Sequence, residues 1–227
     1  MPRTFNASRL KIHRAREHVR ELENLIKDYL ASRPAQFSPA QQIAGTIQFG
    51  SMSFRGIPEN SSAILGDIIH NLRASLDLMA CELCRMNKQS DKDVYFPFSE
   101  SEEKLDEMIQ KRHFDRAGEQ AIGLLKALAP YKGGNVLLRA IHDLDIQDKH
   151  RSLIPTETHI IGPTFRMDAM GGSLVAVPIG DHSKASDIRI MMPPGSALAD
   201  NELIPTVYEL TDTAENVIKA FESLSTI

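Results

Sequence analysis

Two stretches of the chain carry histidine, arginine and aspartate at spacings that fit one flank of a helix. His70, Arg73 and Asp77 stand at positions i, i+3 and i+7 within residues 64–84, so a helix would stack them along one edge of its apolar face. An imidazole, a guanidinium and a carboxylate placed together can transfer protons and hold an anion, and they can equally form a buried ion-pair clamp. The sequence leaves both interpretations open.

The second stretch, residues 135–150, contains His142, Asp145, Asp148, Lys149 and His150. A helical projection places Asp148 close to the centre of the apolar stripe, where an unpaired carboxylate is costly to bury. If the two helices pack antiparallel, their polar flanks can meet. We therefore predict that Arg73 pairs with Asp148 or Asp145, because a planar guanidinium suits a poorly solvated carboxylate.

Three functions are consistent with these residues. The first is a mainly structural network between the two helices that also binds a ligand. The second is metal-independent action on RNA, in which His70 or His150 deprotonates a 2′-hydroxyl, while Arg73 and Lys149 stabilise the phosphorane and the basic first helix holds the RNA backbone. The third is an oligomeric scaffold assembled through residues 9–30. The candidate catalytic residues are His70, Arg73, Asp77, Asp145, Asp148, Lys149 and His150.

We expect neither a metal nor a cofactor. The candidate residues offer nitrogen and oxygen donors, but the chain has no HExxH motif and no doubled ExxH pattern, and the lysine and arginine among them would repel a cation. Cys81 and Cys84 have CxxC spacing, yet they lie within a helix and no second CxxC completes a zinc site. We interpret them as small residues on a helix flank.

Length and composition favour one globular domain over residues 1–227. The net charge of −4 gives no general attraction to nucleic acid or anionic lipid. No apolar run reaches the roughly 18–20 residues that cross a bilayer. The N-terminal residues lack the apolar segment of a secretory signal, so we expect a cytoplasmic protein without membrane contact.

The pattern of the chain predicts an α+β fold, with a helical bundle first and a small antiparallel sheet from the C-terminal half packed on it. The bundle occupies residues 1–152 and includes a short hairpin within residues 43–57, where apolar and polar residues alternate around Gly50. Residues 153–210 are strand-rich and residues 211–227 form the last helix. The first helix, residues 6–32, has apolar residues at alternating steps of three and four, which is the seam of a helix packed in its own domain or of a dimerising arm.

The two polar helices also carry a resemblance. The segments GDIIHNLRASLD, FPF, LAPYKGG and LLRAIHDLDIQDKHR, within residues 64–152, resemble a family of uncharacterised bacterial proteins with a "GD…HNLRxxLD" helix and a "DKHR" helix end. That family has no assigned activity, so the resemblance marks residues and implies no reaction. A weaker resemblance is to HEPN domains, helical bundles that include metal-independent RNases. Their motif has an arginine and a histidine separated by four to six intervening residues, and no arginine of this chain has a histidine at that spacing.

Overall fold

The structure is a computed structural model. It describes residues 5–38, 41–43, 46–48, 51–151, 157–161, 164–170, 173–179 and 187–224, and side chains within 5–34, 55–149 and 188–224. Within these ranges the protein is mainly helical, with six α-helices. They are α1 (Asn6–Ala31), α2 (Asn60–Met86), α3 (Leu105–Lys111), α4 (Glu119–Leu128), α5 (Val136–Arg151) and α6 (Leu203–Leu224).

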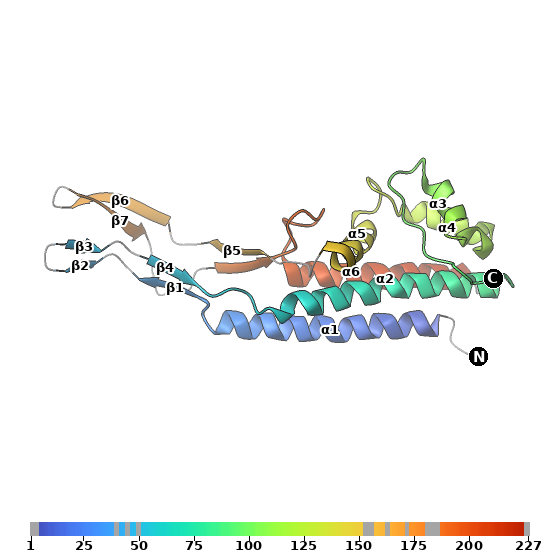
Figure 1. Ribbon diagram of the computed structural model, residues 1–227, viewed down its shortest axis with the longest axis horizontal. Helices are drawn as coiled ribbons and strands as arrows, with labels where there is room; N and C mark the ends of the chain where they lie inside the picture. The colour runs from blue at the N-terminus through green and yellow to red at the C-terminus, as the bar shows by residue number, and fades with distance from the viewer. Residues whose placement is uncertain are drawn as a thin grey trace.

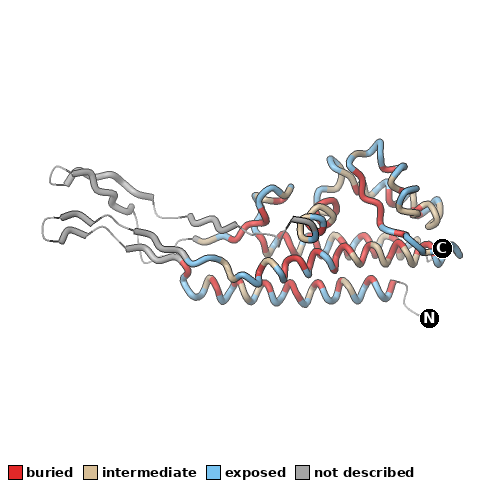
Figure 2. The backbone as a smooth tube through the Cα atoms, viewed as in Figure 1, coloured by how far each residue is buried: buried red, intermediate tan, exposed pale blue. Residues whose placement is uncertain are grey.

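The long helices α1, α2 and α6 lie side by side, and α2 contacts α1, α5 and α6 (Figure 1). The apolar face that the helical period gives to residues 64–84 is buried, and buried residues continue along the whole of α2 (Figure 2). These positions are Ile64, Leu65, Ile68, Ile69, Leu72, Leu76, Met79, Ala80 and Leu83. Since burying one such side chain contributes roughly 1.5–3 kcal/mol, α2 is the element on which the bundle is assembled.

The predicted seam of the first helix is a buried face of α1. It consists of Ile12, Ala15, Val19, Leu22, Ile26 and Tyr29, all of which are buried within this single chain. Because α1 contacts both α2 and α6, the seam is used inside the chain. It is therefore not an exposed apolar stripe of the kind that a dimerising arm would present.

The described residues include eight short strands, which lie beyond the end of the bundle where α1 stops and α2 starts (Figure 1). They form four antiparallel pairs, β1 (Ala35–Ser38) with β4 (Ser51–Phe54), β2 (Gln41–Ile43) with β3 (Thr46–Gln48), β5 (Glu157–Ile161) with β8 (Asp187–Met191), and β6 (Thr164–Met170) with β7 (Ser173–Ile179). Within the described residues no third strand joins any pair.

Two predictions about the strands are wrong. The expected small sheet on the bundle is absent from the described residues. β5 pairs with β8, and β6 and β7, which lie between them in the chain, pair with each other and do not add a strand to the β5–β8 pair. The end of β8 alone reaches the bundle, where Ile190 and Met192 are buried near α6. The expected pairing around Gly50 is also wrong, because both strands that flank it pair with segments earlier in the chain.

The last helix is longer than predicted, because α6 begins at Leu203 instead of Thr211. Pro205 stands in its first turn, where a backbone N–H has no partner within the helix, so proline is tolerated there. A short 3₁₀ turn, η1 (Phe114–Ala117), precedes α4.

Candidate functional site: two arginine clamps and an exposed histidine

The candidate residues gather where α2 meets α5 and where the extended residues 96–100 cross both helices. α5 starts at a capped end, since the backbone N–H of Leu138 donates to Asn135 Oδ1 at 3.0 Å. The two polar helices pack against each other, which is the condition that the sequence left open. Residues 96–100 belong to the FPF segment and the two residues after it, and they complete the site from a third direction.

Arg73 of α2 is buried, with 8% of its surface exposed. Its Nη1 and Nη2 atoms donate to the carbonyl oxygen of Phe96 at 3.3 and 3.4 Å, and Nη2 lies 3.1 Å from Asp77 Oδ1 one turn later. The guanidinium also lies over the ring of Phe98, 4.5 Å from its centroid. Burial lowers the pKa of Arg73, and the carboxylates of Asp77 and Asp145 oppose that shift.

Asp77 accepts a hydrogen bond from the same segment. The backbone N–H of Phe96 donates to Asp77 Oδ1 at 2.9 Å. Burial raises the pKa of Asp77, while the charge of Arg73 and the hydrogen bond from Phe96 act in the opposite direction. The Arg73–Asp77 pair of α2 therefore binds both the N–H and the C=O of one residue, which fixes the backbone of Phe96 against the helix.

Arg139 of α5 makes a second clamp on the same segment, and it was not among the predicted site residues. It is 6% exposed, donates to the carbonyl oxygen of Ser99, and lies 2.7 Å from Glu100 Oε1 and 2.8 Å from Asp143 Oδ1. Hydrogen bonds from Lys132 and Arg139 lower the pKa of Glu100 to about 2. The pair Arg139–Asp143 repeats the i, i+4 spacing of Arg73–Asp77, which is the signal in the sequence that could have identified it.

His142 lies between these clamps as a neutral ring. It stacks on Phe98 with an interplanar angle of 2° and a centroid distance of 4.7 Å. Its Nδ1 atom is buried and makes no hydrogen bond to the described residues. Burial, together with the charges of Arg73 and Arg139, lowers the pKa of His142 to about 4, so the ring is uncharged near neutral pH.

The exposed end of the site contains His70, Asp145 and Lys149. Asp145 of α5 is buried, and its two carboxylate oxygens lie 3.3 Å from His70 Nδ1 and 2.8 Å from Lys149 Nζ. The side chain of His70 is 50% exposed, in contrast to that of Arg73. His70 and Asp145 are thus the groups that connect α2 and α5 at the edge of their contact.

Asp148 lies against Gly66 of α2. A Cβ atom at position 66 would come within 2.7 Å of Asp148 Oδ1, so any residue other than glycine would require this carboxyl group to move. Asp148 Oδ1 is buried and has no hydrogen-bond partner among the described residues. Burial raises the pKa of Asp148, and the carboxylates of Asp145 and Asp67 raise it further.

The predicted pairing of Arg73 with Asp148 or Asp145 is wrong. Asp145 faces His70, one turn before Arg73 on α2, and Arg73 instead faces residues 96–98, which the sequence had not placed beside it. Asp148 faces Gly66, one turn earlier still. The side chain of His150, the remaining candidate, lies outside the described residues.

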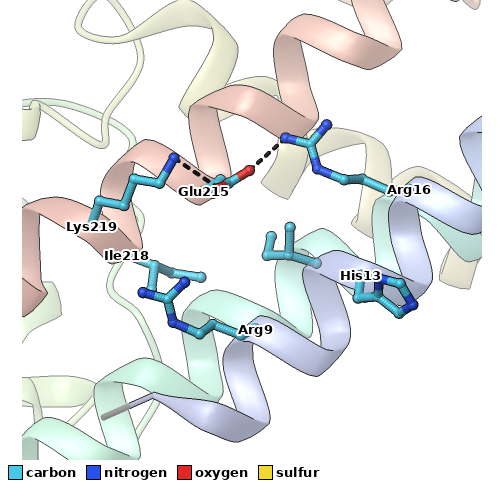
Figure 3. Close-up of a pocket in the computed structure, with 7 residues that line it drawn as sticks. Arg9, His13, Arg16, Glu215, Ile218 and Lys219 are labelled. Carbon is cyan, nitrogen blue, oxygen red and sulfur yellow. Dashed lines mark hydrogen bonds and ion pairs between the residues drawn. The ribbon is translucent and has the colours of Figure 1, made fainter. Parts of the chain in front are cut away.

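A separate groove lies between α1 and α6, and Figure 3 shows its lining residues Arg9, Ile12, His13, Arg16, Glu215, Ile218 and Lys219. Arg9 pairs with Glu222 at 2.5 Å, and Arg16 pairs with Glu215 at 2.5 Å and Asp212 at 2.8 Å. Two of the arginines of the first helix, Arg9 and Arg16, are therefore paired with acidic side chains of α6.

The two cysteines lie on the flank of α2, as the spacing predicted. The thiol of Cys81 donates to the carbonyl oxygen of Val94 at 3.5 Å, and burial raises the pKa of Cys84 to about 11. Among the residues that the structure describes, no group of three or more His, Cys, Asp or Glu side chains is placed to hold a metal ion. No helix in the described ranges has both the length and the apolar character needed to cross a bilayer.

Comparisons with family models, with curated proteins and with solved structures give no match to this chain.

Proposed function

We propose that this protein is a helical scaffold in which the arginine network is a structural clamp, and in which the edge around His70 is left open to bind a ligand. The observation that carries the proposal is the direction of the two buried guanidinium groups. Arg73 and Arg139 come from different helices, and both donate to backbone carbonyls within residues 96–99. A cation that is over 90% buried and directed at the protein's own backbone has little surface left for a substrate.

The clamp joins three elements: α2, α5 and the segment of residues 96–100. Through Arg73 and Asp77 the segment is fixed to α2, and through Arg139 it is fixed to α5. The ring of Phe98 fills the space between them, in contact with the Arg73 guanidinium and the His142 ring. The clamp thereby holds α2 and α5 in the relative position that brings His70 to Asp145.

Action on RNA is the alternative, and the contacts favour it less. Arg73 is the cation that would have to stabilise the phosphorane, and its burial keeps it from a phosphate. Arg9 and Arg16, which would hold the RNA backbone, are paired with acidic residues of α6. His70 and Lys149 remain accessible, so RNA binding is kept as an outcome of the test.

The test compares Arg73→Ala with the matched control Arg85→Ala. Arg85 lies on the same helix and also pairs with an aspartate, Asp91, but its side chain is 51% exposed. We expect Arg73→Ala to lower the free energy of unfolding by about 3–5 kcal/mol, because it leaves Asp77 buried without its cation. Arg85→Ala should change it by less than about 1 kcal/mol, as for other exposed ion pairs.

Both proteins are then titrated with a fluorescent single-stranded RNA, alongside the wild type. We expect no saturable binding by the wild type. Equal thermal stability of Arg73→Ala and wild type, together with RNA binding that only Arg73→Ala loses, would refute the clamp and place a nucleic-acid site between α2 and α5.

A further inference from the structure

His70 differs from the other described histidines that contact a carboxylate. His13 and His18 pair with Glu17 and Glu21 of their own helix, and both glutamates are largely exposed. His70 instead reaches from α2 to α5, where Asp145 has only 7% of its side chain exposed. An exposed imidazole held by a buried carboxylate from another element is an arrangement that surface ion pairs within one helix do not produce.

The contacts of Asp145 fix which nitrogen of His70 carries the proton. Lys149 Nζ, which can only donate, donates to Asp145 Oδ2 at 2.8 Å. An ionised carboxylate only accepts hydrogen bonds, so His70 Nδ1, at 3.3 Å, is the donor. In the neutral ring the lone pair then lies on Nε2, and the side chain of His70 is 50% exposed.

We propose that His70 and Asp145 form a proton-transfer dyad that hydrolyses a small uncharged or cationic ester at the edge between α2 and α5. The inference rests on the part of the proposed function that leaves this edge open. His70 Nε2 acts as the base, Asp145 orients the ring and stabilises its protonated form, and Lys149 keeps Asp145 in place without contacting the substrate.

The reaction balances with water as the only co-reactant. His70 Nε2 takes a proton from water as the water oxygen bonds to the ester carbonyl carbon. The bond from that carbon to the leaving oxygen then breaks, and the proton on Nε2 passes to the departing alkoxide. The products are a carboxylic acid and an alcohol, and the dyad returns to its starting state.

The charges around His70 select the class of substrate. Asp67 lies one turn before His70 on α2, and Asp145 and Asp148 approach from α5. The neighbouring cations are Lys149, which is bound to Asp145, and Arg73, which is buried and paired with Asp77. This excess of negative charge repels polyanions such as RNA and tolerates a neutral or cationic molecule. The dyad therefore acts on a different class of molecule from the one that a basic surface would bind.

The experiment measures p-nitrophenol release from p-nitrophenyl acetate by wild type, His70→Gln, Asp145→Asn and the control His13→Gln. General acid–base groups contribute roughly 10²–10⁴-fold, so we expect His70→Gln to lower the protein-dependent rate at least tenfold. His13→Gln should retain the wild-type rate, because His13 pairs only with an exposed glutamate of its own helix. A rate for His70→Gln within twofold of wild type would refute the dyad.

A second readout does not depend on a substrate. ¹⁵N NMR of the His70 ring should show a proton on Nδ1 in the wild type and a shift of the tautomer balance in Asp145→Asn. A proton on Nε2 in the wild type would overturn the proposal even if some ester hydrolysis were seen. Thermal melts of each variant separate this outcome from failure of the clamp, since His70→Gln removes a half-exposed side chain and leaves both buried arginines intact.

Discussion

Gly66 lies in the middle of α2, where alanine would ordinarily be the better residue. Replacing glycine by alanine within a helix favours the folded state by about 1 kcal/mol, because alanine loses less conformational entropy. Here a Cβ atom would lie 2.7, 2.8 and 2.9 Å from Oδ1, Oδ2 and Cγ of Asp148, well inside the 3.5–4.0 Å of an ordinary contact. Gly66→Ala therefore has two opposing effects on the free energy of unfolding: the steric clash with Asp148 lowers it, and the higher helix propensity of alanine raises it.

The steric term is the larger of the two. Adding a methyl group to a packed contact costs about 1–3 kcal/mol, and all three atoms of the Asp148 carboxyl group would have to move together. Subtracting the propensity gain of about 1 kcal/mol leaves Gly66→Ala destabilised by up to about 2 kcal/mol. In a chain that already carries Asp148→Ala the carboxyl group is gone, and the same substitution should be stabilising by about 1 kcal/mol.

Urea unfolding of the four proteins in this double-mutant cycle gives the coupling energy directly. Asp148→Asn is the control for charge, since it keeps the shape of the side chain, and Gly66→Ala should remain destabilising in that background. If Gly66→Ala stabilised the wild type as much as it stabilised Asp148→Ala, the Asp148 carboxyl group would move aside freely. The close approach that defines this end of the site would then be refuted.

Two further predictions concern the buried ring and the first helix. The pKa of His142 is about 4 in the folded protein and about 6.5 in the unfolded chain, so between these pH values the unfolded state binds more protons. The free energy of unfolding therefore falls as the pH drops from 6.5 to 4, by roughly 3 kcal/mol in total. His142→Phe, which keeps a ring against Phe98, should remove that component of the pH dependence. An unchanged loss of unfolding free energy between pH 6.5 and 4 in this variant would contradict the lowered pKa of His142. Val19→Asp buries a carboxylate in the fully buried face of α1 and should lower the free energy of unfolding by several kcal/mol, as measured in urea. A stable Val19→Asp protein of half the wild-type mass in solution would instead show that the seam joins two copies.

The helices were predictable because their signal is local and repeated. Nine apolar positions of α2 and the whole seam of α1 follow from the helical period, and each of them is buried. The pairing of the strands was not predictable from alternation, which gives the position of a strand along the chain and not its partner. In β5 and β8 the partners are about 30 residues apart, so a short-range pattern cannot select them.

The candidate site was predicted in its composition but not in its connections. The spacing of His70, Arg73 and Asp77 places them on one flank of α2, and the structure agrees. Which residue lies opposite depends on the relative rotation of α2 and α5 and on the path of residues 96–100, both of which are tertiary properties. The repeated Arg-x-x-x-Asp spacing is the one local feature that marks both clamps, since i, i+4 pairs hold a guanidinium ready to bind a third group.

Asp145 links the clamp and the exposed dyad, although it belongs structurally to the second. Its charge raises the pKa of Arg73, so it helps to keep the buried guanidinium ionised, while its oxygens are used by His70 and Lys149. Removing this charge should therefore weaken both parts, whereas removing Asp77 acts on the clamp, where its oxygen binds Arg73 and the Phe96 N–H. The carboxylate of Asp145 thus interacts with the buried cation of Arg73 and with the half-exposed imidazole of His70, so the polar residues of α2 and α5 lie on the flanks that face each other. It also makes the position of His70 dependent on the same packing that buries Arg73.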